Sequence, residues 1–194
     1  MIKDKRTLRK EIRQQLAELP ETHFTENSKI ISNKLVEWLN MHPGVTKVAL
    51  YSALPSEVNL KAVTVHLPKI EWHYPVVNRT EMTFHRVSNP SSLQQGFCDI
   101  LEPDPMVHPA ILSSDLDLIL CPGLSFTKTG SRLGRGGGFY DRFLSTISGT
   151  PIMGVCLEEQ LSNALPCETH DILMTHLITP TGYLTTKKNT PNIA

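Results

Sequence analysis

The sequence predicts an α/β fold, a three-layer α/β/α sandwich whose central sheet is mainly parallel or mixed. Short apolar runs typical of buried strands alternate with segments whose apolar residues recur at helical spacing, and such alternation places helices on both faces of a sheet. The 194 residues are 40% hydrophobic, and a chain of this length buries roughly 70% of its unfolded surface. We therefore expect one domain over residues 1–194, with a polar, frayed tail from Thr185.

The charge balance and the cysteines exclude several functional classes. The 19 basic and 19 acidic residues give a formal net charge of zero, so anion binding requires a local cluster and a general nucleic-acid surface is not expected. No apolar segment has transmembrane length, and none follows the basic N-terminus as in a secretory signal. The four cysteines form no CxxC pair, and we expect Cys121 and Cys156 to be buried. These features favour a reducing cytoplasm without nucleic-acid or membrane partners, and we expect a monomer.

The first two elements are predicted to be helices. An amphipathic pattern over residues 4–19 ends at Pro20, and a second pattern over residues 26–40 has Thr25 as its candidate N-cap. The buried side of the first helix is expected to consist of Leu8, Ile12, Leu16 and Leu19.

A basic row runs along the first predicted helix. Lys5, Arg9 and Arg13 recur every four residues and so share one face. Charge alone favours a solvated face for this row.

The next segment carries a carboxylate near the end of a strand. Residues 47–51 form an apolar run, and Glu57 lies in the turn that follows. In open α/β sheets ligands gather at the carboxyl ends of strands. The alternative is that Glu57 favours the N-terminus of the helix indicated by Leu60, Val63 and Leu67.

Two further strands are predicted over residues 71–77 and 82–87, joined as a hairpin around Asn78 and Arg79. Residues 88–114 are rich in proline and serine and are expected to be a surface excursion, because the sheet pattern resumes afterwards.

The central feature is a long glycine-rich connection between an apolar strand over residues 117–121 and a helix that starts near Phe139. Connections of this length usually carry function. Glycines leave backbone amides free to surround a ligand, and a helix start adds further amide donors. Arg132 and Arg135 lie between the glycines, so amides and guanidinium groups together suit phosphate oxygens. The glycines are Gly130, Gly134, Gly136, Gly137 and Gly138.

The glycine spacing itself is not specific. No Gly-Lys-Ser/Thr follows, as a P-loop requires, and Phe139 occupies the third glycine position of a dinucleotide motif. A flexible turn with solvated arginines explains the spacing equally well.

Beyond this helix we expect a strand over residues 152–157, a short helix over 159–165 and a last strand over 176–179. Asp141 falls in the first turn of the helix after the glycines. It could serve only as a dipole partner, or it could bind Mg²⁺ beside phosphates, since this ion prefers oxygen ligands. The histidines lack metal-ligand spacing and no Ser/His/Asp arrangement stands out, so covalent catalysis is not indicated.

The run GSRLGRGGGFYDR, preceded by a strand and PGLSF, resembles the signature of the 5-formyltetrahydrofolate cyclo-ligase family. Further similar segments follow in the family's order and approximate spacing, so the resemblance covers nearly the whole chain. These segments are KRTLR at 5–9, YSALPSEVNL at 51–60, YPVV at 74–77, ILEP at 100–103 and residues 154–171.

The resemblance implies an enzyme of one-carbon folate metabolism that uses ATP and Mg²⁺ to close the ring of 5-formyltetrahydrofolate. It implies a role in the charge-stabilising step for Arg135, and metal contacts for Asp141 and Asp171. Glu57, Arg135, Phe139 and Tyr140 would contact the folate. The ATP-binding residues would be Lys5, Arg9, Arg132, Gly134, Arg135, Gly136, Gly137, Gly138 and Tyr140.

Two departures from the family pattern concern this site. Some members carry lysine where Gly137 stands, which leaves one fewer positive charge here. The family's counterpart of residues 88–114 often carries an aromatic residue that could cover the pterin, and Phe97 lies one position from the aligned place, so the stacking residue stays open.

Two rival functions remain at the level of sequence. A sugar-phosphate isomerase or CoA-transferase-like enzyme could share the layered sheet, but it would need a catalytic carboxylate or lysine pair that the sequence does not display. A binding module could hold nucleotide or folate without turnover.

Overall fold

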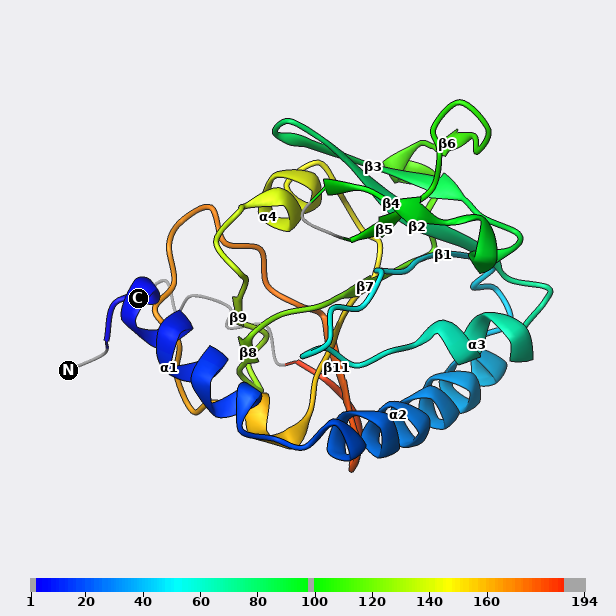
Figure 1. Ribbon diagram of the computed structural model, residues 1–194. Coiled ribbons are helices and arrows are strands. Elements are labelled where there is room, and N and C mark those ends of the chain that lie inside the picture. The colour runs from blue at the N-terminus through cyan, green and yellow to red at the C-terminus, as the bar shows by residue number, and fades with distance from the viewer. Residues whose placement is uncertain (1–2, 98–99, 187–194) are drawn as a thin grey trace, which may run out of the picture.

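The computed structural model describes residues 3–97 and 100–186, and an eight-stranded sheet forms its centre (Figure 1). Cys98 lies outside the described residues. The strand order is β12-β11-β10-β7-β1-β2-β3-β6. In chain order these strands are β1 (Lys47–Ala49), β2 (Glu71–Asn78), β3 (Glu81–Arg86), β6 (Ala110–Ile111), β7 (Leu118–Cys121), β10 (Ile152–Val155), β11 (His176–Thr179) and β12 (Gly182–Thr185).

The sheet is mixed, with a parallel centre. The strands β2, β1, β7, β10 and β11 pair in parallel, whereas β3, β6 and β12 join the two edges antiparallel. The expected mixed sheet is therefore confirmed. The C-terminal ends of its parallel strands all lie at the same end of the sheet.

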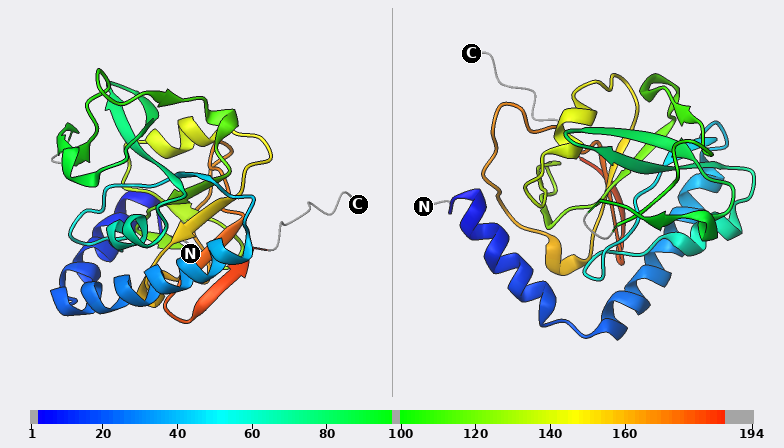
Figure 2. Two further views of the ribbon diagram at one scale, coloured as in Figure 1. Left: turned by 90° about the vertical axis from the view of Figure 1, so that its right-hand side faces the viewer. Right: turned by 45° about the horizontal axis from the view of Figure 1, so that its top comes forward.

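Helices cover both faces of the sheet, as predicted. The helices are α1 (Lys5–Ala17), α2 (Glu21–Met41), α3 (Lys61–His66) and α4 (Phe139–Leu144). Leu118 and Leu120 of β7 belong to the core that α1, α2 and α3 cover. Ile119 and Cys121 alternate to the opposite core, which contains Leu144 of α4. Figures 1 and 2 show α4 across the sheet from the other three helices.

The first two helices begin directly after their N-cap residues, Asp4 for α1 and Pro20 for α2. Asp4 caps α1 by accepting hydrogen bonds from the amides of Arg6 and Thr7 at 2.9 and 3.0 Å. The helix α2 begins at Glu21 after Pro20, so the prediction of Thr25 as its N-cap is wrong. Thr25 lies inside the helix and its hydroxyl donates to the Glu21 carbonyl, because Phe24 packs into the core and extends the helix one turn toward Pro20.

The predicted hairpin after the first helices is confirmed. Strands β2 and β3 pair from His73 with Arg86 to Asn78 with Glu81, and Arg79 takes a left-handed φ of 55° in the turn. The segment 88–114 forms the small hairpin of β4 (Gln94–Gln95) and β5 (Leu101–Glu102) and then returns to the sheet edge as β6. Short 3-10 turns flank these strands at Pro90–Ser92 and Ser113–Asp115.

Three expectations near the C-terminus are wrong. The helix over 159–165 is only a 3-10 turn, Glu158–Gln160. A further strand, β12, follows β11. Thr186 is buried and its hydroxyl donates to the Met174 carbonyl, so the chain is not frayed at Thr185; residues 187–194 lie outside the description.

A buried glutamine explains the lost helix. The Gln160 amide donates to the Gly123 carbonyl at 2.7 Å, and its Oε1 accepts from the Leu157 amide at 2.9 Å. Beyond it, the Ser162 amide donates to the Phe126 carbonyl. Tertiary hydrogen bonds therefore hold an extended segment where the local pattern favoured helix.

Within the described ranges, no helix has the length and apolar character to cross a membrane.

We predict that Gln160→Ala lowers the free energy of unfolding by about 2–3 kcal/mol, because buried backbone groups lose their partners. Urea denaturation measures the loss. Gln15→Ala on the exposed side of α1 is the control and should change stability little. Equal small effects in both variants would contradict the role assigned to Gln160.

Candidate active site

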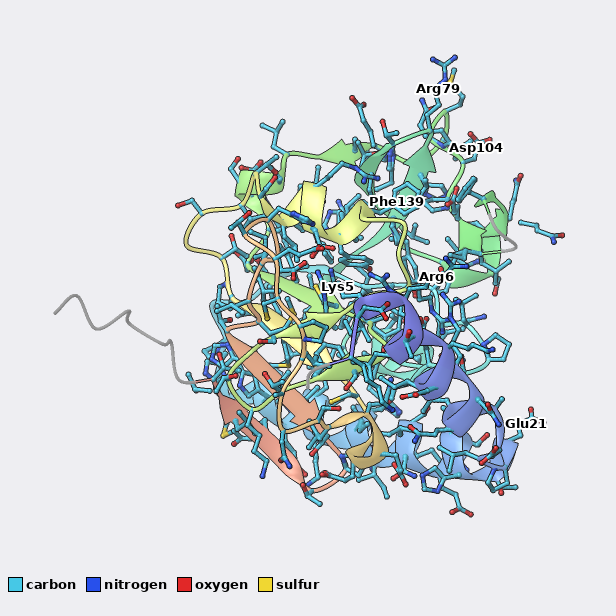
Figure 3. The ribbon with its side chains drawn as sticks, turned by 90° about the vertical axis from the view of Figure 1, so that its left-hand side faces the viewer. Lys5, Arg6, Glu21, Arg79, Asp104 and Phe139 are labelled. Atoms are coloured by element: carbon cyan, nitrogen blue, oxygen red, sulfur yellow. The ribbon has the colours of Figure 1, made fainter. Side chains whose placement is uncertain are left out.

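A cavity of about 300 Å³ lies where α1, the turn after β1, the glycine-rich connection and the segment before β11 meet. Every residue that the sequence analysis assigned to nucleotide, folate or metal lines this cavity. In Figure 3, Lys5 of α1 and Phe139 of α4 lie in the middle part of the view, whereas Glu21, Arg79 and Asp104 lie at the periphery. The fold thus brings together residues that are up to 166 positions apart in the chain.

The glycine-rich connection is shorter than the sequence suggested. A hairpin of β8 (Ser125–Phe126) and β9 (Arg132–Leu133) occupies its first part, so the open loop runs only from 134 to 138. Gly138 precedes α4 with a φ of 67°, and a Cβ there would lie 2.6 Å from Arg142 Nη1. Only glycine enters the helix this way without strain.

Two arginines of α1 hold this loop by its carbonyl oxygens. Arg9 Nε donates to the Gly134 carbonyl at 2.9 Å, and Arg13 Nη2 donates to the Arg135 carbonyl at 2.8 Å. A solvated face is therefore the wrong interpretation for Arg9, which is half-buried, whereas Arg13 stays exposed while it makes this contact. The carbonyls point toward α1, so Arg9 and Arg13 position the loop whose amides are candidate anion donors.

Lys5, the first member of the row, pairs with two carboxylates. Its Nζ lies 2.8 and 2.6 Å from the two oxygens of Asp171 and 2.8 Å from Glu168 Oε2. Burial raises the pKa of Asp171, but the Lys5 ammonium and the Glu168 amide outweigh it, so the pKa lies below its ordinary value of 3.8. Glu168, His170 and Asp171 place their potential ligand atoms within 4.8 Å of one another.

Arg132 is buried and pairs with Asp141. Its Nη2 lies 2.8 Å from Asp141 Oδ1, its Nη1 donates to the Pro122 carbonyl, and its guanidinium lies 5.3 Å from the centre of the Tyr140 ring. Arg132 Nε and the Tyr140 hydroxyl are buried and have no hydrogen-bond partner among the described residues. Burial raises the pKa of Tyr140 well above its ordinary value, so its hydroxyl stays protonated.

Arg135 crosses the cavity to Glu57. Its Nε donates to Glu57 Oε1 at 2.8 Å and its Nη2 to Ser56 Oγ at 2.9 Å. The other oxygen of Glu57 accepts from the Leu54 amide, and α3 begins only at Lys61. Glu57 therefore lies outside the first turn of that helix, and its interpretation as a helix-dipole partner is wrong.

Aromatic side chains form one rim of the cavity. Phe139 lines it and meets Phe97 edge to face, with ring centres 5.8 Å apart. Phe139 also packs against the core beneath α4, so this core aromatic residue has a side that faces the cavity. Phe97 is 47% exposed and touches the cavity only through Phe139; it stands one position from the place where the family pattern puts its aromatic residue.

Several lining residues escaped the sequence analysis as site candidates, and three of them carry polar groups relevant to the site. They are Tyr51, Glu102 and Glu168. Glu102 is buried and accepts from the Val77 amide at 3.3 Å, and burial raises its pKa. A carboxylate directly after the apolar pair Ile100-Leu101 was the available signal. Tyr51 gave no such signal, because it stands at the end of an apolar run as many core tyrosines do. In the structure its hydroxyl donates to the Val58 carbonyl.

The sequence matches the model of the 5-formyltetrahydrofolate cyclo-ligase family over residues 1–180. The chain belongs to this family.

Several proteins named 5-formyltetrahydrofolate cyclo-ligase are moderately similar in sequence to this chain. A 5-formyltetrahydrofolate cyclo-ligase of Mycolicibacterium smegmatis is 39% identical over 92 residues, 47% of each chain. The protein of that name from Saccharomyces cerevisiae is 33% identical over 60% of this chain and 57% of its own. These matches span about half of the relatives' length. The mouse cyclo-ligase is 26% identical over 87% of this chain and 89% of its own.

Solved structures share the cyclo-ligase fold over nearly the whole chain. A 5,10-methenyltetrahydrofolate synthetase from Mycoplasma pneumoniae has a TM-score of 0.75 and 26% identity, and the match covers 90% of this chain and 97% of the other. The Aquifex aeolicus synthetase has a TM-score of 0.78 and 28% identity, covering 98% and 99%.

The ion pair of Lys5 with Asp171 predicts a pH dependence of stability. Because folding lowers the pKa of Asp171, the pair stabilises the fold above the unfolded pKa of about 4, and this contribution is lost as pH falls through the lower folded pKa. We expect Asp171→Asn to be less stable than the unmodified chain at pH 7 and to lose less stability between pH 5 and 2. Thermal unfolding across that range measures both slopes; parallel curves would contradict the prediction.

Proposed function

We propose that this protein closes the ring of 5-formyltetrahydrofolate to 5,10-methenyltetrahydrofolate and couples the step to ATP hydrolysis, releasing ADP and phosphate. One observation carries the proposal. In a chain of the cyclo-ligase family, the glycine loop and the cations Lys5, Arg9, Arg132 and Arg135 line the same cavity as the apolar and carboxylate surface suited to a pterin. The cavity volume of about 300 Å³ is in the range of small-molecule sites.

The chemical problem is that a formamide oxygen is a poor leaving group. In the proposed mechanism the formyl oxygen attacks the terminal phosphorus of ATP, the bond to ADP breaks, and an imidate phosphate forms. The neighbouring N10 amine of the folate then attacks the activated formyl carbon, inorganic phosphate departs with the former formyl oxygen, and the amine loses its proton. Because the substrate supplies both nucleophiles, the protein only has to position the reactants and neutralise charge.

The charged residues of the cavity divide this work in the proposal. The loop amides and the cations Lys5, Arg9 and Arg132 hold the phosphates. The Tyr140 hydroxyl, which stays protonated, donates a hydrogen bond to an oxygen atom of the bound ligand. Glu57, Phe139 and Tyr140 contact the folate. Arg135 stabilises charge at the transferred phosphoryl group, since its Nε and Nη2 are held by Glu57 and Ser56 while Nη1 has no partner among the described residues.

The carboxylates of Asp141 and Asp171 fit Mg²⁺ by their chemistry, because this ion prefers oxygen ligands and both side chains line the cavity. The neighbouring His170 is a poorer candidate, because Mg²⁺ disfavours imidazole. When bound, the ion would neutralise phosphate charge. Arg132 orients the Asp141 carboxylate, and Lys5 orients the Asp171 carboxylate and lowers its pKa.

A direct assay tests the activity. Protein, ATP, Mg²⁺ and 5-formyltetrahydrofolate should yield the absorbing methenyl product, and omission of either ATP or Mg²⁺ should abolish it. Folded protein that binds both ligands but forms no product would support a binding module and overturn the proposal.

A substitution separates the role of Arg135 from simple binding. We expect Arg135→Ala to lower kcat by about 10³-fold or more, the effect of a charge-stabilising arginine in phosphoryl transfer, while the Kd of the folate changes far less. Steady-state kinetics and folate titration measure the two quantities. Arg6→Ala, which removes an exposed arginine of α1, is the control and should keep both near their original values. Equal losses of kcat and folate affinity in Arg135→Ala would contradict the assignment.

A further inference from the structure

Arg142 of α4 lies outside the active-site cavity but contacts the loop that borders it. Residues 134–138 line the cavity, whereas Arg142 does not and is exposed. Its guanidinium donates to two backbone carbonyls, from Nη2 to Gly137 at 3.0 Å and from Nε to Thr80 at 2.9 Å. Thr80 belongs to the turn between β2 and β3. Arg142 therefore joins the glycine loop to the β2–β3 hairpin.

The backbone around Arg142 leaves room for its guanidinium to reach the loop. The Phe139 ring lies against the guanidinium, with 5.1 Å between Arg142 Cζ and the ring centre. A Cβ at Gly138 would lie 2.6 Å from Arg142 Nη1, and a Cβ at Gly137 would lie 2.7 Å from the Phe139 ring. Non-bonded heavy atoms prefer about 3.5–4.0 Å. The two glycines thus leave the space that the side chains of Arg142 and Phe139 occupy.

The carbonyl that Arg142 holds determines where the next amide points. In a trans peptide unit the C=O and N–H bonds lie in one plane and point in opposite directions. The Gly137 carbonyl faces Arg142, on the side away from the cavity. The Gly138 amide, which belongs to the same peptide unit, therefore faces the other way.

A second peptide unit of the loop is held in the same manner. Arg13, which does not line the cavity either, donates to the Arg135 carbonyl at 2.8 Å, so the Gly136 amide points away from α1. The amides of Gly136 and Gly138 have no hydrogen-bond partner among the described residues. Both glycines line the cavity, so their amides are donors available to a ligand there.

We propose that Arg142 is a positioning residue, which holds the Gly137 carbonyl outside the cavity and so keeps the Gly138 amide directed at a phosphate group on the glycine loop. The identity of this anion as a phosphate of ATP rests on the proposed function, whereas the orientation of the loop by Arg142 does not. Arg142 does not touch the ligand itself, because its side chain does not line the cavity. The planar fork of arginine suits this task, since Nε and Nη2 reach two carbonyls at once.

The first measurement needs no ligand. Amide NMR spectra of the unliganded chain report the surroundings of Gly136, Gly137 and Gly138. We expect Arg142→Lys, which keeps the charge but replaces the fork by a single ammonium, to shift or broaden the Gly137 and Gly138 resonances. The control Arg79→Lys makes the same exchange on the β2–β3 turn, at the periphery of the molecule (Figure 3), and should leave these resonances unchanged.

The second measurement is titration calorimetry with inorganic triphosphate and Mg²⁺, a probe that carries the phosphates of ATP without the nucleoside. Arg142→Lys should weaken triphosphate binding about three- to tenfold, the effect of one lost hydrogen bond. Binding of 5-formyltetrahydrofolate should change far less, and Arg79→Lys should bind both ligands like the original chain. If Arg142 acted only through its charge, Arg142→Lys would keep the original affinity and Arg142→Gln alone would lose it.

The outcomes separate this inference from the proposed function. Shifted glycine resonances with selectively weakened triphosphate binding support the positioning role. Unchanged resonances, or unchanged triphosphate affinity in Arg142→Lys, overturn it even where the methenyl product forms. A large fall in Tm would assign Arg142 to the stability of the whole fold and also overturns it, since exposed side chains usually contribute little. An original chain that binds no triphosphate contradicts the proposed function, and the glycine resonances alone then decide the positioning role.

Discussion

The site depends on the hydrogen bonds through which α1 holds the glycine loop. Residues 136–138 have no side chains that could pack, so the loop takes its shape from its backbone contacts. Arg9 and Arg13 reach the carbonyls of Gly134 and Arg135 across more than 120 positions of sequence. Charge-assisted bonds of this kind contribute about 1.5–3 kcal/mol when shielded from water, and less at the exposed Arg13. They form only because Ile12 and Leu16 bury one side of α1 against the core.

The cations of the cavity are all held by protein acceptors before any ligand arrives. Lys5 pairs with Asp171 and Glu168, Arg132 with Asp141, and Arg135 with Glu57. This pairing keeps buried charge from being isolated, which would be costly, and it fixes the orientation of each head group. Under the proposed function, a polyphosphate would share these cations, and the carboxylates would then be available to the metal. Positioning of this kind suits a reaction in which the substrate supplies both nucleophiles.

The parallel centre of the sheet explains why distant segments meet. The carboxyl ends of the parallel neighbours β1 and β7 lie at the same end of the sheet. The turn with Glu57 follows β1, and the glycine-rich connection follows β7. Ligand sites gather at this edge in open α/β sheets because loops from neighbouring strands converge there. Glu102, which sequence analysis missed, reaches the same cavity from β5, a strand outside the central sheet.

The sequence by itself determined the alternation of strands and helices, the β2–β3 hairpin and the residues around the glycines, because apolar periodicity and turn chemistry are local properties. It also determined the family, since the motif run combines residues whose joint occurrence is specific. The tertiary structure alone decided that Gln160 holds an extended segment in place of a helix, that β12 closes the sheet edge, and that Arg13 positions the loop. The contacts of Gln160 with Gly123 and of Arg13 with Arg135 join residues far apart in the chain, whereas β12 forms by pairing with β11, the strand directly before it. The energy of a long-range hydrogen bond depends on where the fold places its partner, which no local pattern encodes.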